Sequence, residues 1–227
     1  MVAQYKQTNQ QKPDSRKATI IHLVGISLIC TLAVCLIVYL DHIFFWRNTS
    51  NTYRQKDPNT SVYSQKDWAQ RLDVPGLPNF HKVSDNLYRG AQPTSEGMSQ
   101  LKGLGVRTIV NLRSMHSDRD ELGDTKLAYE HINMTSLNFK DEDAVRFLKI
   151  VTDSNCTPVF VHCQHGADRT GIMCAVYRIA VQGWSKNEAI EEMIHGGFGF
   201  HKIWKNLVDY IRRMDIEKIK KNAGLKE

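Results

Sequence analysis

Cysteine is scarce in this chain, and so is net positive charge outside its first quarter. Five cysteines among 227 residues are too few for the disulfide framework of a small secreted scaffold. The formal net charge is +6, but residues 1–60 contribute most of it, with seven Lys and Arg against three Asp. The rest of the chain is nearly neutral, which argues against a nucleic-acid-binding domain that depends on basic charge. We therefore expect no nucleic-acid partner.

Charge is absent altogether from residues 18–40, between Lys17 and Asp41. As a helix this segment would extend over roughly 34 Å, and about 20 apolar residues are enough to cross the hydrocarbon core of a bilayer. The apolar run is longer than the central region of a cleaved signal peptide, and no A-x-A-like cleavage site follows it. The sequence therefore predicts one uncleaved N-terminal transmembrane helix.

Positively charged residues are denser before this helix than after it. By the positive-inside rule, the short basic tail of residues 1–17 faces the cytoplasm, and the rest of the chain lies on the outer side, in the periplasm or a lumen. Residues 41–70 are mostly polar, which is typical of a tether. The folded domain is expected over residues 71–227, held at the membrane by residues 18–40.

Short β-rich runs alternate with helical patterns along this domain. The runs at residues 106–112 and 158–162 are typical of buried parallel strands. The other predicted strands cover residues 86–90 and 132–137, and helices are expected over residues 95–104, 141–152, 170–181, 185–195 and 203–220. This alternation predicts an α/β fold with a mostly parallel central sheet flanked by helices.

The predicted strand at residues 158–162 leads into a short loop and then a helix, with Cys163 at the start of the loop and Arg169 at its end. Backbone N–H groups of such a loop can hold a phosphate at the carboxyl end of a strand. Arg169 supplies a planar fork that pairs with two phosphate oxygens. The same donors should favour the thiolate of Cys163. The predicted phosphate-binding residues are Gln164, His165, Gly166, Ala167, Asp168 and Arg169.

The sequence His162-Cys163-(five residues)-Arg169-Thr170 resembles the signature of the cysteine-based protein tyrosine phosphatases. It is most similar to the dual-specificity-like branch, and to its membrane-exported bacterial members. The resemblance covers about residues 80–210. It includes the stretch LYRGAQP at residues 87–93, which is similar to the entry strand of that family.

This resemblance implies a two-step mechanism without metal or cofactor. Cys163 would attack phosphorus to form a cysteinyl phosphate, while Arg169 and the loop amides stabilise the equatorial oxygens. Thr170 would hydrogen-bond the sulfur and ease its departure. The implied substrate is protein phosphotyrosine, with phosphoserine or phosphothreonine as a possible addition. A phosphoinositide is the alternative substrate class.

The family also needs an aspartate that protonates the leaving oxygen and then activates water. Asp141 and Asp143 lie 22 and 20 positions before Cys163, in the region where the family carries this acid. Both are equally interpretable as first-turn helix residues that complement the helix dipole. Asp168, inside the loop, is a third candidate for the acid, or the N-cap of the following helix.

Two weaker interpretations concern the surroundings of the loop. His162, Cys163 and His165 could be a metal cluster, but no second pair of ligands at the expected spacing supports it, and we expect no metal. Arg113 follows the strand at residues 106–112 and could guide an anionic substrate or be a solvated loop charge. A phosphate-binding module without turnover remains the alternative to an enzyme.

Overall fold

The structure is a computed structural model that describes residues 67–225. The predicted basic tail, transmembrane helix and most of the predicted tether lie outside the described residues. Within residues 67–225, none of the helices combines the length and apolarity needed to cross a membrane.

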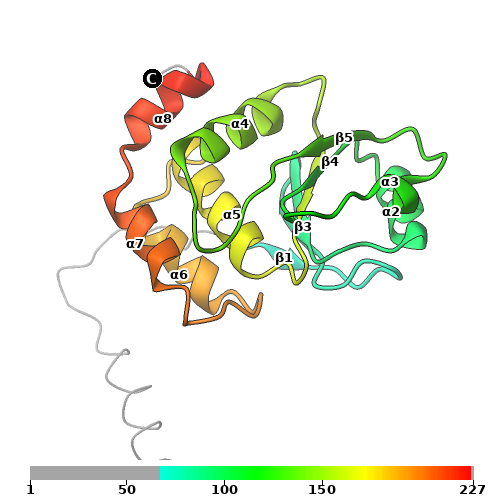
Figure 1. The fold of residues 1–227 in the computed structure, drawn as a ribbon, viewed down its shortest axis with the longest axis horizontal. Helices are drawn as coiled ribbons and strands as arrows, with labels where there is room; N and C mark the ends of the chain where they lie inside the picture. Colours follow the sequence, from blue (N-terminus) through cyan, green and yellow to red (C-terminus); the bar gives the residue numbers. More distant parts are fainter. Residues whose placement is uncertain (1–66, 226–227) are drawn as a thin grey trace, which may run out of the picture. The chain divides into compact units, whose positions relative to one another are not determined.

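Six strands form one sheet in the order β1-β2-β3-β6-β4-β5 (Figure 1). The inner strand β6 (Val159–His162) pairs in parallel with β3 (Leu87–Gly90) on one side and with β4 (Thr108–Asn111) on the other. At the edges, β5 (Ala128–His131) pairs in parallel with β4, whereas β2 (His81–Ser84) and β1 (Gln70–Arg71) are antiparallel. The predicted α/β fold with a mostly parallel sheet is confirmed.

Helices cover both faces of this sheet. The helices are α2 (Ser95–Gly103), α3 (Arg119–Leu122), α4 (Asp141–Thr152), α5 (Asp168–Ala180), α6 (Lys186–His195), α7 (Lys205–Arg213) and α8 (Ile216–Ala223). In β6, Val159 and Val161 belong to the larger core with α4 to α8, while Phe160 between them belongs to the smaller core with α2 and α3. Successive side chains of a strand point to opposite faces, so this fully buried strand separates two apolar layers.

The predicted strand at residues 132–137 is wrong. The edge strand is β5, which ends at His131, opposite the last residue of β4. The N–H of Ile132 still donates to the Asn111 carbonyl at 2.9 Å, but β4 ends there, so the residues after Ile132 have no ladder to join. Ile132 and Met134 are nevertheless buried, and the apolar pattern that suggested a strand reflects this burial within a loop.

The predicted helix at residues 203–220 is two helices, α7 and α8. The chain leaves helical geometry at Met214, and the Asp215 carboxylate accepts a hydrogen bond from the N–H of Lys218 at 3.1 Å, which caps α8. An Asp at this position starts a new helix. The short elements β1, β2 and α3, each of four residues or fewer, were not predicted from the sequence.

A buried ion pair joins α5 to α6. Arg178 is 2% exposed and its Nε donates to the Glu192 carboxylate at 2.7 Å; its Nη1 also donates to the Val83 carbonyl, at 3.2 Å. The same carboxylate accepts the backbone N–H of Ala69 at 2.7 Å. Glu192 therefore holds together two helices and the first described residues of the chain.

Candidate active site

The structure confirms the predicted order of strand, loop and helix around Cys163. Strand β6 ends at His162, and α5 begins at Asp168, so residues 163–167 form the loop. Gly166 has φ +68°, and a Cβ atom there would lie 2.4 Å from the carbonyl carbon of Gly90. Only glycine fits such a conformation at such a close approach, so Gly166 lets the loop fold tightly against the end of β3.

Two side chains hold the loop through its carbonyl groups. The Asn79 side-chain amide donates to the carbonyls of His165 and Phe198, both at 2.9 Å. The fully buried Arg89 donates to the Gly166 carbonyl at 2.8 Å, and its guanidinium lies 3.6 Å from the centre of the Phe198 ring. The loop is thus fixed from its outer side by groups on two other segments.

The N–H groups of the loop have no such partners. Among the described residues, none of the backbone N–H groups of residues 164–168 donates a hydrogen bond. A short run of unpaired amides leading into a helix N-terminus is a binding site for an anion with several oxygens. The predicted phosphate-binding loop therefore has the donors that this function requires.

The nucleophile candidate and its neighbours lie at this loop. Cys163 is 2% exposed, at the end of β6. Arg169, in the first turn of α5, reaches across to the Leu112 carbonyl at 3.4 Å. The hydroxyl of Thr170 is buried and has no hydrogen-bond partner among the described residues. An unpaired buried hydroxyl costs free energy. The O–H of Thr170 can therefore donate to the Cys163 sulfur, which is the interaction that the sequence predicts.

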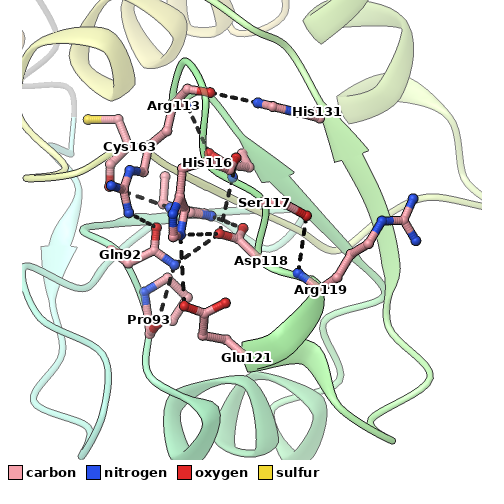
Figure 2. Close-up of polar contacts among 12 residues, drawn as sticks. Gln92, Pro93, Arg113, His116, Ser117, Asp118, Arg119, Glu121, His131 and Cys163 are labelled. Atoms are coloured by element: carbon pink, nitrogen blue, oxygen red, sulfur yellow. Dashed lines mark hydrogen bonds and ion pairs between the residues drawn. The ribbon is translucent and has the colours of Figure 1, made fainter.

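Behind the loop lies a buried carboxylate that the sequence analysis missed. Asp118 is fully buried and accepts hydrogen bonds from His162 Nε2 at 2.7 Å, Gln92 Nε2 at 2.9 Å and Asn111 Nδ2 at 3.1 Å (Figure 2). Burial by itself would raise the pKa of Asp118, but His162, the hydrogen bond from Gln92 and the nearby His116 together outweigh it, so the pKa lies below its ordinary value of 3.8. Asp118 thereby fixes the ring of the residue that precedes Cys163.

Replacing Asp118 by Asn should destabilise the protein in a pH-dependent way. The change removes a buried charge-assisted hydrogen bond, which costs about 1–3 kcal/mol at pH 7. Because folding lowers the pKa of Asp118, its stabilising contribution is complete above about pH 3.8 and is lost as the pH falls through the pKa of the folded state. Urea unfolding at pH 7 and pH 3 measures this. Asp120→Asn, at an exposed neighbour, is the control, and an equal effect at both pH values would contradict the assignment.

Asp118 also belongs to a cluster whose residue types could bind a metal ion, which is the one such cluster found among residues 67–225. His116, Asp118 and Glu121 place one potential ligand atom each within 4.8 Å of one another. However, both oxygens of Asp118 already accept hydrogen bonds from His162, Gln92 and Asn111. We therefore interpret this group as part of the hydrogen-bond network around Asp118.

Asp141 and Asp143 both lie in the first turn of α4. Asp141 accepts a hydrogen bond from the Tyr210 hydroxyl at 2.7 Å, and Asp143 accepts the backbone N–H of Lys140 at 3.2 Å. Burial raises the pKa of Asp143. No hydrogen bond or ion pair of the described residues joins either carboxylate to the Cys163 loop, so their role as general acid stays a prediction.

Asp168 is not the N-cap of α5. The N-cap is Ala167, and Asp168 is the first residue of the helix. Its carboxylate accepts the backbone N–H of His201 at 2.9 Å and pairs with His201 Nδ1 at 2.9 Å. Asp168 therefore connects the loop to the segment that precedes α7, and this use of its oxygens weakens its candidacy as the acid.

The chain is similar to known phosphatases over most of the described domain. Residues 76–206 match the family described as PTP-NADK, DSP-PTPase phosphatase fused to NAD+ kinase. The dual specificity protein phosphatase TpbA of Pseudomonas aeruginosa is 35% identical over 151 residues, which are 66% of this chain and 68% of TpbA. An Arabidopsis thaliana protein named inositol diphosphatase DSP5 is 27% identical over 125 residues, 51% of this chain and 60% of its own length.

A crystal structure of TpbA in complex with pTyr shares the fold. The match covers 71% of this chain and 98% of the TpbA chain, with a TM-score of 0.63 and 32% sequence identity. These similarities agree with the geometry of the Cys163 loop, since each relative named here is a phosphatase. The chain belongs to the DSP-PTPase family of cysteine-based protein tyrosine phosphatases, and it is a protein-tyrosine/dual-specificity phosphatase.

Proposed function

We propose that the protein hydrolyses phosphotyrosine in proteins through a cysteinyl-phosphate intermediate on Cys163. The loop carries this proposal, because its unpaired N–H groups lie between the buried Cys163 and the first turn of α5. The phosphate would be held by these amides and by Arg169, with phosphorus above the sulfur. The unpaired hydroxyl of Thr170 would donate to the sulfur when it leaves.

Phosphotyrosine is favoured over a phosphorylated inositol by a relative of known structure. The TpbA structure, 32% identical to this chain, has pTyr bound. The inositol diphosphatase relative makes an inositol phosphate the second candidate.

The substrate class can be tested by measuring how fast the full chain, in detergent and with a chelator present, releases phosphate from different substrates. We expect release from a phosphotyrosine peptide to be at least about tenfold faster, in kcat/KM, than from a phosphoserine peptide or an inositol phosphate panel. Asp141→Asn and Asp143→Asn, assayed on the same peptide, would identify the general acid by a loss of kcat. Fastest release from an inositol phosphate would overturn the protein-phosphatase proposal.

We also propose that residues 18–40 anchor the enzyme in a membrane with the phosphatase domain on the outer side. The support is the uncharged run of these residues and the denser positive charge before it. Such an anchor would raise the local concentration of membrane-bound phosphoproteins. Release of the full chain from membranes by alkaline carbonate would contradict the anchor.

A further inference from the structure

A second arginine lies at the mouth of the phosphate-binding loop. Strands β4 and β6 are parallel neighbours, and the N–H of Leu112 donates to the His162 carbonyl at 2.9 Å. In the register of these strands Asn111 lies opposite His162, so Leu112 follows opposite Cys163, and Arg113 is one residue further along at the same edge of the sheet. Arg169 also contacts the Leu112 carbonyl, at 3.4 Å.

Three hydrogen bonds fix the position of Arg113. Its N–H donates to Asn111 Oδ1 at 2.7 Å, and its carbonyl lies 2.6 Å from His131 Nε2. Its Nη1 donates to Gln92 Oε1 at 2.9 Å (Figure 2). The backbone of Arg113 is thus fixed on both sides, and its guanidinium is held at one nitrogen.

Gln92 places this guanidinium at the loop. The backbone N–H of Gln92 contacts the Gln164 carbonyl at 3.4 Å, and its side-chain amide donates to Asp118 at 2.9 Å. Gln92 therefore touches the phosphate-binding loop, the carboxylate behind it and the guanidinium of Arg113. Because these contacts fix Gln92, the Arg113 guanidinium that Gln92 binds has little freedom to move.

The charge of Arg113 is not neutralised by the protein. None of the ion pairs among residues 67–225 includes Arg113, and its Nε and Nη2 have no acceptor among these residues. The Asp118 carboxylate, which Gln92 connects to Arg113, is itself bound by His162 and Asn111. The remaining donors of Arg113 are thus available to an anion.

We propose that Arg113 is a second phosphate-binding residue, which contacts the substrate phosphate together with Arg169, and that Gln92 is its positioning residue. The proposal rests on the phosphatase function proposed above and extends it. A cation that contacts the phosphate in both ground and transition states mainly strengthens binding. Its loss should raise KM and leave kcat nearly unchanged.

The test compares variants of the full chain in detergent on a phosphotyrosine peptide, with inorganic phosphate as a competitive inhibitor. We expect Arg113→Gln to raise both KM and the inhibition constant of phosphate about tenfold, with kcat changed by less than about threefold. Arg113→Lys should recover part of the loss, because it keeps the charge but not the planar fork. Gln92→Leu should give an intermediate increase.

The matched control is Arg107→Gln. Arg107 is exposed, precedes the same strand β4 and donates to the Ser154 carbonyl at 3.0 Å. It should leave both constants unchanged. Unchanged phosphate inhibition in Arg113→Gln, or an equal increase in Arg107→Gln, would overturn the proposal.

A second measurement separates this proposal from the proposed function. Inorganic phosphate should raise the Tm of the wild-type protein, and Arg113→Gln should reduce this increase while folding at a similar temperature in the absence of phosphate. If no substrate is hydrolysed but this loss of phosphate stabilisation is observed, the phosphate contact holds and the proposed reaction fails. If the peptide is hydrolysed but the stabilisation by phosphate is equal in both proteins, the contact itself is wrong.

Discussion

Replacing Cys163 by Ser should abolish phosphate release, with kcat reduced by about 10⁴-fold or more. The reaction needs a sulfur nucleophile beneath the bound phosphate, and a serine hydroxyl without an adjacent base is a poor substitute. The amides of residues 164–168 and Arg169 are untouched by this change, so phosphopeptide binding should persist. Single-turnover release of phosphate and the affinity for a fluorescent phosphotyrosine peptide measure the two properties separately.

Two other cysteines provide controls for this experiment. Cys156 is partly exposed, whereas burial raises the pKa of Cys174 to about 11, so that its thiol stays protonated at neutral pH. Cys156→Ser should keep full activity, and Cys174 should resist alkylation under conditions that inactivate the enzyme. Substantial turnover by Cys163→Ser would rule out the cysteinyl-phosphate mechanism.

Replacing Glu192 by Ala should lower the free energy of unfolding by about 3–5 kcal/mol. The change leaves the guanidinium of Arg178 buried without its counter-ion and removes the acceptor for the N–H of Ala69. Breaking one partner of a buried pair costs more than the pair itself contributes, because the remaining charge cannot be solvated. Urea unfolding followed by tryptophan fluorescence measures the loss.

The neighbouring residue on α6 is a matched control. Glu191 is exposed and lies 3.8 Å from His195 in a solvent-facing pair, so Glu191→Ala should change the stability by less than about 1 kcal/mol. Replacing both partners by apolar residues, Arg178→Met with Glu192→Leu, should recover much of the loss. A cost for Glu192→Ala no greater than that for Glu191→Ala would show that the pair contributes nothing.

The fold class could be predicted because the most informative elements are local in sequence. The strand that became β6 is a continuous β-rich run, and α6 begins with a Ser185 N-cap that accepts the N–H of Glu188. By contrast, β2 pairs with β3 through only a few residues, one of which is the buried His81. Its burial depends on Phe198, whose ring lies 4.8 Å from that of His81, and a contact between residues so distant in sequence leaves no local pattern.

The site was predictable to the same extent. Cys163 begins the loop that follows β6, and Arg169 and Thr170 lie in the first turn of α5, so their spacing in the sequence alone brings them together. Asp118 and Gln92 could not be identified in this way, because they meet the loop only after the sheet places β3, β4 and β6 side by side. Each is an ordinary polar residue in its own segment, and its importance comes from its partners.

The contact between Gly90 and Gly166 has a consequence for evolution. A Cβ atom at position 166 would overlap the backbone of Gly90, and one at position 90 would lie 2.9 Å from the ring of Phe160. Position 166 cannot gain a side chain while the loop keeps its shape, whereas one at position 90 requires the ring of Phe160 to shift. Homologues that retain the catalytic cysteine and arginine but carry a larger residue at position 166 must therefore have rebuilt this loop or lost its function. This glycine can therefore identify, among distant homologues, those that keep a working phosphate site.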